Sequence, residues 1–416
     1  MSATLKEIKN NNTNIPVIFE KNNNLPIFNL QLVFQNSGYI QDGITPGITN
    51  LSAKILNEGT KKDGAINFAR NLENNAISID ATTGFETFVI EISCLKSEYK
   101  LALNYLNQIL QDPNLTKKTL DKIKLLEISK LQQKENDFDY VASKNLKKIQ
   151  YNGTPLEYTN KGEIKHIQKT SIKDIEKQLS NILNLDNLII VVGGDLEFKK
   201  FKKDIKDTLT FIQPQGTSNL EKIKIAKKAK KKVTYKDTEQ SYIYFSSPFH
   251  INYNSDESYK AKVASFILGG SGFGSRLMEE IRVKNGLAYS AYGNISNSKS
   301  HSHFTGYLQT KLNNTKKAKN MVNKIVKEFV KNGVTQKELQ AAKNFLLGSE
   351  PLRTETFSQR LNRAFHLYYK GLPFNYPEKE LEMINKLTVE ELNTFIKKHQ
   401  EITQLSYSIV TKETNK

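Results

Sequence analysis

Cysteine is almost absent from this 416-residue chain, and its scarcity excludes two kinds of chemistry. The single residue, Cys94, cannot form an intrachain disulfide and cannot build a cluster of thiolate zinc ligands. It lies in segment 88–95, where apolar and polar residues alternate as they do in a half-buried strand. We therefore expect a buried structural thiol and no thiol chemistry.

Long apolar runs are also missing. No stretch approaches the roughly 20 apolar residues that a helix needs to cross a bilayer. The first residues lack the basic start and the apolar run of a secretory signal. The chain as written therefore predicts a soluble cytoplasmic protein with no membrane partner. A processed periplasmic form that had been given a new Met1 would read the same, so both compartments remain open.

Arginine is scarce, because the net charge of +18 comes almost wholly from lysine. The densest basic run, 221–232, contains no aromatic residue on which a base could stack. We therefore expect no nucleic-acid partner and interpret 221–232 as a solvated, lysine-rich linker. Five of the six arginines fall between 276 and 363, which indicates that this region needs the planar geometry of a guanidinium.

The two halves of the chain on either side of this run repeat one order of elements. In the first half we expect strands at 14–19, 28–34, 76–81 and 87–95, with helices near 49–56, 97–111 and from 116 onward. In the second half we expect strands at 242–245, 287–294 and 303–308, with helices at 255–268, 315–331 and from 335 onward. Strand pairs and helices in runs predict an α+β fold.

Helix caps set the spacing of this repeat. Thr116 and Thr335 each begin a helix and lie 219 residues apart, and Thr335 with Glu338 has the spacing of a capping box. At the same spacing, apolar residues recur at helical positions: Leu106, Leu110, Leu120, Ile123 and Leu126 match Ile325, Phe329, Leu339, Ala342 and Phe345. We predict two homologous halves, 1–220 and 233–416, each a β-sheet with helices on one face, arranged as a clam-like pair.

Two long segments carry a resemblance to a known family. Residues 267–290 contain a glycine-rich stretch followed by Arg-Leu-Met-Glu-Glu-Ile-Arg-Val-Lys-Asn-Gly-Leu-Ala-Tyr, and residues 38–60 end in Asn-Glu-Gly-Thr. Both are similar to segments of the pitrilysin/insulinase zinc metallopeptidases, and 267–290 resembles the small bacterial and mitochondrial processing-peptidase branch. Segments 191–195 and 350–356 also resemble this family, so the similarity spans roughly residues 14–410.

The zinc motif of the active members is degenerate in this chain. Where the family has His-x-x-Glu-His, this sequence has Asn50, Ala53 and Lys54, and the downstream glutamate ligand falls at or next to Leu131. Two histidines at i and i+4 are needed to hold zinc, and the glutamate between them activates water. No histidine precedes His166, so a shifted alignment does not restore the site. We expect no metal and no cofactor in this chain.

Two other patterns are interpreted without a ligand. His301 and His303 would lie on one face of a strand, but no nearby carboxylate completes a metal site, so we expect a packed pair. The glycine-rich loop lacks the Gly-Lys-Ser/Thr ending of a P-loop and follows a helix, so we expect no nucleotide there. Its glycines are Gly269, Gly270, Gly272 and Gly274.

The resemblance implies a role for Arg282 and Tyr289. The matching arginine and tyrosine of the family reach the bound peptide and its scissile carbonyl. Their chemistry suits that role, because a guanidinium offers several donors to carbonyl oxygens and a phenol can donate to an oxyanion. The alternative is that Arg282 merely pairs with Glu279 or Glu280 and that Tyr289 packs in a strand.

The resemblance also implies a partner, because in this family the zinc and the Arg/Tyr pair can lie on two chains. We expect a non-catalytic, substrate-positioning subunit of a heterodimeric zinc metallopeptidase. Such a subunit is inactive alone, and a homologous partner holds the zinc at which the peptide substrate is cut. The alternative is an inert peptide-binding or scaffold protein of the same fold with no protease partner.

Overall fold

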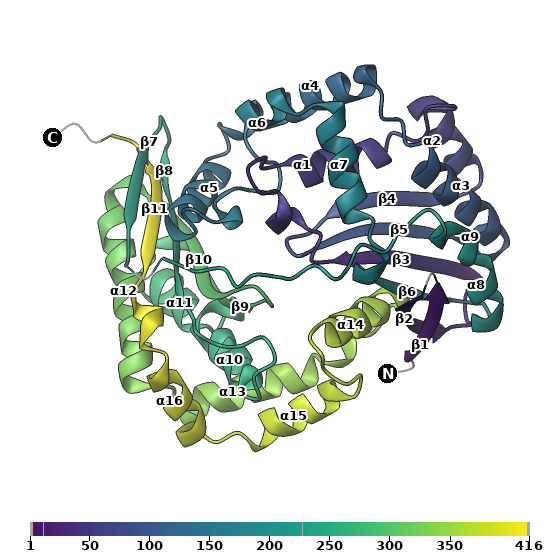
Figure 1. Ribbon diagram of the computed structural model, residues 1–416. Coiled ribbons are helices and arrows are strands. Elements are labelled where there is room, and N and C mark those ends of the chain that lie inside the picture. The colour runs from purple at the N-terminus through teal and green to yellow at the C-terminus, as the bar shows by residue number, and fades with distance from the viewer. Residues whose placement is uncertain (1–2, 11, 227, 414–416) are drawn as a thin grey trace. The chain divides into compact units, whose positions relative to one another are not determined.

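Two mixed β-sheets organise the chain, of which the computed structural model describes residues 3–10, 12–226 and 228–413 (Figure 1). The first sheet has the strand order β1-β2-β6-β3-β5-β4, and the second has β7-β11-β8-β10-β9. In each sheet one pair is parallel, β2 with β6 and β7 with β11, and the other neighbours are antiparallel. The second sheet thus repeats the first without β1, which confirms the predicted α+β fold with two related sheets.

Alternation of side chains explains the strands. In β5 every second residue, from Phe88 to Cys94, is buried, so the predicted strand and its structural thiol are confirmed. The strands of the first sheet are β1 (Thr4–Asn10), β2 (Thr13–Lys21), β3 (Ile27–Gln35), β4 (Ser78–Thr83), β5 (Thr87–Leu95) and β6 (Leu188–Gly194). Those of the second are β7 (Lys231–Tyr235), β8 (Gln240–Pro248), β9 (Ala288–Asn297), β10 (Ser302–Lys311) and β11 (Ser406–Thr411).

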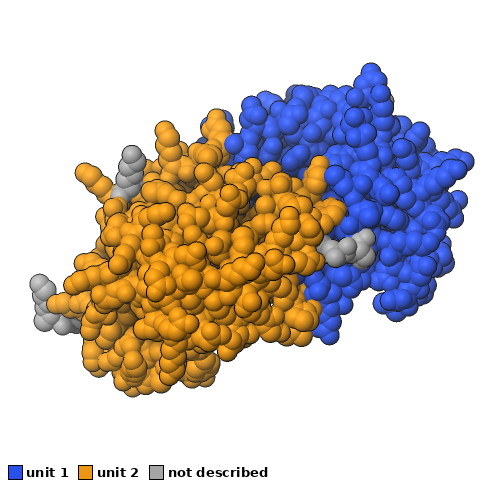
Figure 2. All heavy atoms as spheres, turned by 90° about the horizontal axis from the view of Figure 1, so that it is seen from below, with its two compact units in different colours: residues 1–132, 158–220, 354–366 blue, residues 133–157, 221–353, 367–416 orange. Residues whose placement is uncertain are grey.

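The chain forms two compact units that are discontinuous in sequence (Figure 2). Unit 1 consists of residues 1–132, 158–220 and 354–366, and unit 2 of residues 133–157, 221–353 and 367–416. The proposed division at 221–232 stays a prediction about the chain; Lys227 within it lies outside the described residues. The described part of this segment belongs to unit 2, where the amide of Ile223 donates to the carbonyl of Ser300 over 2.8 Å.

Each unit combines its sheet with several helices. Unit 1 has α1 (Ile48–Leu56), α2 (Gly64–Asn74), α3 (Tyr99–Gln111), α4 (Lys117–Lys134), α6 (Ile164–Lys169), α7 (Ile172–Ile182), α8 (Phe198–Asp204) and α9 (Lys206–Leu209). Unit 2 has α10 (Ser258–Ser265), α11 (Arg276–Met278), α12 (Thr315–Asn332), α13 (Gln336–Gly348), α15 (Tyr376–Lys386) and α16 (Val389–Lys398). In unit 2, Phe245 and Phe304 of the sheet share one buried core with Phe329 of α12 and Phe395 of α16. Within the described part of the chain, no helix is both long and apolar enough to cross a membrane.

The predicted caps are present. The hydroxyl of Thr116 accepts the backbone N–H of Thr119 over 3.2 Å at the start of α4. Thr335 and Glu338 bond to each other's backbone amides and begin α13, so the capping box is confirmed. The predicted helix 255–268 is different in detail. It is α10 followed by a π-helical segment, Phe266–Gly270.

One helix of each half packs on the sheet of the other unit, which the sequence did not predict. Helix α5 (Phe138–Gln150) belongs to unit 2, where its Asp139 accepts hydrogen bonds from Tyr244 at 3.1 Å and from Gln309 at 2.7 Å. Most of helix α14 (Phe357–Tyr369) belongs to unit 1. The two helices begin 219 residues apart, the spacing of the repeat, so equivalent helices are exchanged.

A buried ion pair fixes α14 on the first sheet. The guanidinium of Arg360 donates from Nε to Glu20 Oε1 over 2.8 Å, and the side chain of Glu20 is only 1% exposed. The side chain of Gln31 donates to Asn362 over 3.1 Å nearby. Among the residues that the structure describes, the other carboxylate oxygen of Glu20 has no hydrogen-bond partner, so this buried charge depends on the arginine.

We predict that Arg360→Met lowers the free energy of unfolding by about 3 kcal/mol or more, because it leaves the carboxylate of Glu20 buried and unpaired. The double variant Glu20→Leu/Arg360→Met should recover much of that loss. Arg353→Met, which breaks a half-exposed pair with Glu350, is the matched control and should cost under about 1 kcal/mol. Urea denaturation measures all three, and a single-variant loss no larger than the control would contradict the assignment.

Candidate functional site

Helix α1 holds three of the four degenerate zinc positions. Asn50 and Ala53 are buried, 8% and 2% exposed, and Lys54 is half-buried. An amide oxygen, a methyl group and an ammonium do not fit a zinc ion, which requires imidazole, thiolate or carboxylate ligands. The residues of α1 therefore offer no metal chemistry.

The fourth position lies in α4 and is apolar. Leu131 is 4% exposed, and one turn earlier Glu127, 3% exposed, accepts a hydrogen bond from Lys130 over 2.9 Å. Among the residues that the structure describes, no three histidine, cysteine, aspartate or glutamate side chains gather where they could hold a metal ion. Glu127 is thus engaged with a lysine beside an apolar residue.

Helix α1 is stabilised at its start by a carboxylate. Asp42 accepts the backbone N–H groups of Gly47 at 2.6 Å and of Thr49 at 3.1 Å, which supplies partners for the free amides of the first turn. Gly47 has φ of 97°, a left-handed conformation that glycine adopts without strain. Burial raises the pKa of Asp42 to about 6, although the hydrogen bonds from Thr49 and Gly47 oppose that shift.

The second candidate site lies in unit 2, around Arg282. Its guanidinium carbon is 4.7 Å from the ring centroid of Tyr289 and 4.7 Å from that of Phe273. Tyr289 is 81% exposed and Phe273 is 67% exposed. Arg282 lies in a π-helical segment, Glu279–Lys284, and Tyr289 is the second residue of β9, so the turn between them brings the two side chains together.

Arg282 does not pair with either neighbouring glutamate among the described residues. Glu280 pairs with Lys284 at 2.6 Å, and Arg282 has no carboxylate within 4 Å among the described residues. Tyr289 belongs to β9, but its side chain is 81% exposed and is not buried against the sheet. Sequence reasoning missed Phe273, and the signal that could have found it is a large aromatic residue inside a run of glycines.

The glycine-rich loop presents Phe273. Gly272 and Gly274 flank it with φ of 68° and 88°, values that L side chains rarely adopt. Gly269 lies against β9, because a Cβ there would come within 2.6 Å of the backbone nitrogen of Gly293. Gly270 ends the π-helical segment that leads into the loop. The loop therefore combines close packing at its base with an exposed aromatic tip.

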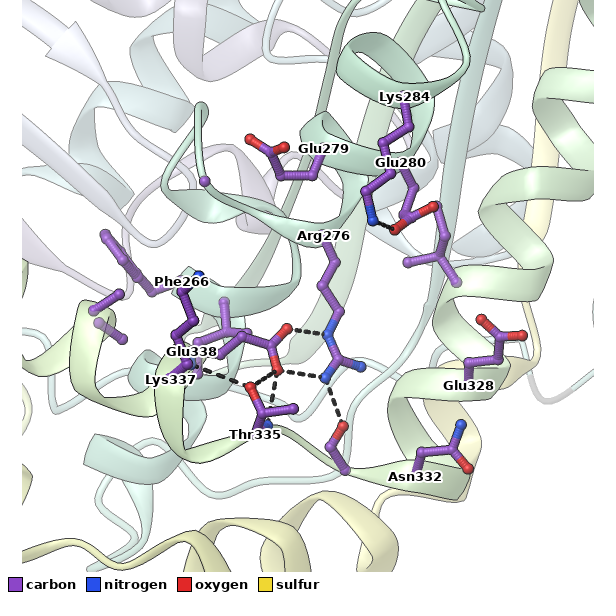
Figure 3. A pocket seen from close by; sticks show the side chains of 16 residues that line it. Phe266, Arg276, Glu279, Glu280, Lys284, Glu328, Asn332, Thr335, Lys337 and Glu338 are labelled. Atoms are coloured by element: carbon purple, nitrogen blue, oxygen red, sulfur yellow. Dashed lines mark hydrogen bonds and ion pairs between the residues drawn. The ribbon is translucent and has the colours of Figure 1, made fainter.

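Arg276 anchors this region (Figure 3). Its Nε and Nη2 donate to the two oxygens of Glu338 over 2.5 and 2.8 Å, and Nη2 also donates to the carbonyl of Gly333. Burial would raise the pKa of Glu338, but the hydrogen bonds from Arg276 and Thr335 lower it overall. Beside this network lies a cavity of about 690 Å³, lined by Phe266 and by residues of α12 and α13.

The histidine pair packs, as expected. The rings of His301 and His303 stack with their centroids 5.1 Å apart, and Tyr151 of unit 2 meets both rings edge-on. Burial lowers the pKa of His303 to about 3, so this ring stays neutral at physiological pH.

Two family models together match most of the chain. The chain matches the family model for insulinase (peptidase family M16) over residues 17–162 and that for the peptidase M16 inactive domain over residues 169–346. It is 43% identical to a "non-peptidase homolog YmxG" of Helicobacter pylori, over 96% of this chain and 93% of that protein. It is 23% identical to an "uncharacterized zinc protease YmxG" of Bacillus subtilis, over 76% of each.

Two solved structures show the same fold. A peptidase M16 inactive domain from Pseudomonas fluorescens superposes with a TM-score of 0.90, at 23% identity and over 99% of each chain. A protease from Helicobacter pylori superposes with a TM-score of 0.85, at 17% identity, over 99% of this chain and 100% of that chain. At these identities the likeness concerns the fold alone.

The buried carboxyl of Asp42 predicts a pH dependence of stability. Its pKa of about 6 lies above the ordinary value of 3.8, so the native state binds more protons than the unfolded state between these pH values. The raised pKa of Asp42 therefore adds about 3 kcal/mol to the free energy of unfolding below about pH 4. This contribution is lost as pH rises through 6.

Asp42→Asn should remove this part of the pH dependence, because the amide does not titrate. Urea denaturation between pH 4 and pH 7 measures it, with the exposed residue Asp121→Asn as the control that should keep the wild-type slope. Parallel curves for Asp42→Asn and the wild type would show that the carboxyl of Asp42 keeps its ordinary pKa.

Proposed function

The chain belongs to the insulinase family, peptidase family M16, as a member without the family's zinc ligands, and we propose that it is a catalytically inactive subunit that positions peptide. Its Arg282 and Tyr289 act on a peptide bound at the zinc site of a homologous partner chain. The observation that carries the proposal is a contrast within one chain. The metal positions of α1 and α4 are filled with unsuitable side chains, while a half-buried Arg282 lies against the exposed ring of Tyr289.

The zinc positions support inactivity in isolation. Asn50, Ala53, Lys54 and Leu131 provide neither the ligands for zinc nor the glutamate that would deprotonate water. The relative from Helicobacter pylori that shares 43% identity is named a non-peptidase homolog, which is consistent with the same property in this chain.

The contact between Arg282 and Tyr289 supports a role toward peptide. Among the described residues Arg282 has no acceptor for its N–H groups, so its donors are available to carbonyl oxygens. The phenol of Tyr289, on a side chain that is 81% exposed, can donate to an oxygen that gains negative charge during hydrolysis. Because this chain offers no metal to activate water, the hydrolytic centre must come from another chain. The alternative is an inert peptide-binding protein of the same fold, and the experiments below distinguish it from a peptidase subunit.

We predict that the purified chain contains no stoichiometric zinc and does not hydrolyse peptides alone. Elemental analysis and a peptide-cleavage assay measure this. The variant with Asn50→His, Ala53→Glu, Lys54→His and Leu131→Glu, which restores the ligand types, is the control for zinc detection. One zinc per wild-type chain together with chelator-sensitive cleavage would refute the prediction.

A further prediction concerns the complex with a zinc-bearing homologue that co-purifies with the tagged chain. Tyr289→Phe should lower kcat by about a hundredfold, because one donor to the developing oxyanion is lost. Arg282→Ala should raise KM as well as lower kcat, because several donors to the peptide are lost together. Size-exclusion chromatography confirms assembly, and steady-state kinetics gives both constants.

Tyr235→Phe and Arg353→Ala are the matched controls, because both residues are exposed and lie elsewhere in unit 2. Both should retain wild-type kinetics. Unchanged kinetics in Tyr289→Phe and Arg282→Ala would assign these residues a structural role. Failure to recover any zinc-bearing partner would favour the inert peptide-binding alternative.

A further inference from the structure

The guanidinium of Arg282 lies between two aromatic rings, and within the described part of the chain its N–H donors have no acceptor. Its central carbon lies 4.7 Å from the ring centroids of both Phe273 and Tyr289. Cation–π contacts use the charge of the guanidinium but leave its in-plane donors free. Among the described residues none of these donors has a hydrogen-bond acceptor, and no carboxylate lies within 4 Å of the side chain. No carboxylate of the described residues therefore forms an ion pair with Arg282.

We propose that Phe273, Arg282 and Tyr289 form a clamp that binds a carboxylate group of a peptide, with Phe273 as a positioning residue that the family resemblance did not identify. This inference rests on the proposed function, in that the same face of unit 2 meets peptide. The carboxylate is either the C-terminus of the peptide or an Asp or Glu side chain, which present the same chemistry to the clamp.

The donor geometry favours a carboxylate over a neutral carbonyl. A carboxylate has two oxygens that match two parallel N–H groups of a guanidinium. It also carries the negative charge that would neutralise the positive charge of Arg282. The hydroxyl of Tyr289 provides one more donor beside this fork. The acidic residues nearby do not fill the role, because Glu280 is paired with Lys284 and Glu279 lies more than 4 Å from the guanidinium.

Phe273 acts through Arg282. It is 67% exposed at the tip of the glycine-rich loop, so it contributes little to the core of unit 2. Its ring restricts the long arginine side chain before a ligand binds. Without the ring, the arginine would lose this conformational freedom on binding, which lowers affinity. Pre-ordering of this kind raises affinity without a direct contact between the phenylalanine and the ligand.

The test uses the full chain and four labelled peptides of one length and one core sequence. Two have a free C-terminus and two are amidated, and within each pair an internal residue is Glu or Gln. Fluorescence anisotropy gives each Kd. We expect the peptide that carries the recognised carboxylate to bind about tenfold or more tightly than its neutral counterpart. Comparison of the free-acid with the amidated peptides tests recognition of the C-terminus. Comparison of the Glu with the Gln peptides tests recognition of an acidic side chain.

Variants locate the effect. Arg282→Lys keeps a charge but not the fork, and should lose most of the preference for the carboxylate. Phe273→Ala should weaken binding of the carboxylate peptide several-fold and reduce the preference, whereas Phe273→Tyr, which keeps a ring, should restore both. Phe345→Ala removes a phenylalanine that is 54% exposed on α13 and should leave both unchanged. Thermal unfolding confirms that each variant is folded.

Equal affinity for charged and neutral peptides would overturn the clamp, as would no binding of any peptide at the highest soluble concentration. A preference that survives in Arg282→Lys would also overturn it. The outcome is separable from that of the proposed function. Loss of kcat in Arg282→Ala complexes without a carboxylate preference leaves the proposed function standing and removes the clamp. A preference for the carboxylate peptide, together with an unchanged kcat in Arg282→Ala complexes, supports the clamp and contradicts the proposed function.

Discussion

The ion pair between Arg276 and Glu338 holds together the part of unit 2 from which Arg282 projects. Two parallel hydrogen bonds of 2.5 and 2.8 Å join the side chains, and the arginine also lies over the ring of Phe329 at 5.3 Å. Glu338 is at the same time a member of the capping box that begins α13. One half-buried carboxylate therefore fixes the start of a helix and the helical segment that follows the glycine-rich loop. Such a pair is worth more than an exposed one, because its geometry is bidentate and screening by water is reduced.

Local patterns explain how much of the fold could be predicted from the sequence. Alternating residues located β5 with Cys94 inside it, and hydroxyl residues at the right spacing located the starts of α4 and α13. These signals depend only on residues near one another in the chain. The exchange of α5 and α14 was not predictable in this way, because an amphipathic helix carries an apolar face but does not indicate which sheet it covers.

The candidate site shows the same limit. The resemblance identified Arg282 and Tyr289, and the turn between helix and strand explains their proximity. The π-helical segments at 266–270 and 279–284 each depart from the 3.6-residue period that sequence reasoning assumes. The ring of Phe273 comes from a loop without any period, so its contact with Arg282 follows only from the tertiary structure.

Helix α1 also shows that a catalytic motif can be lost without loss of the element that carried it. Its apolar residues Leu51 and Ile55 remain buried, and Asp42 supplies partners for its first amides. None of these interactions involves the positions of the zinc ligands, so substitution there removes chemistry and leaves the helix stable.

The exchange of α5 and α14 has a consequence for synthesis on the ribosome. The strands of the first sheet are complete once Gly194 has been made, yet Arg360, the partner of the buried Glu20, is made more than 160 residues later. At about 5–20 residues per second, the nascent chain has roughly ten seconds or longer in which Glu20 has no Arg360 to pair with. Unit 1 therefore acquires its last segment only near the end of translation, and a fragment that stops at the lysine-rich segment lacks both α14 and the partner of Glu20.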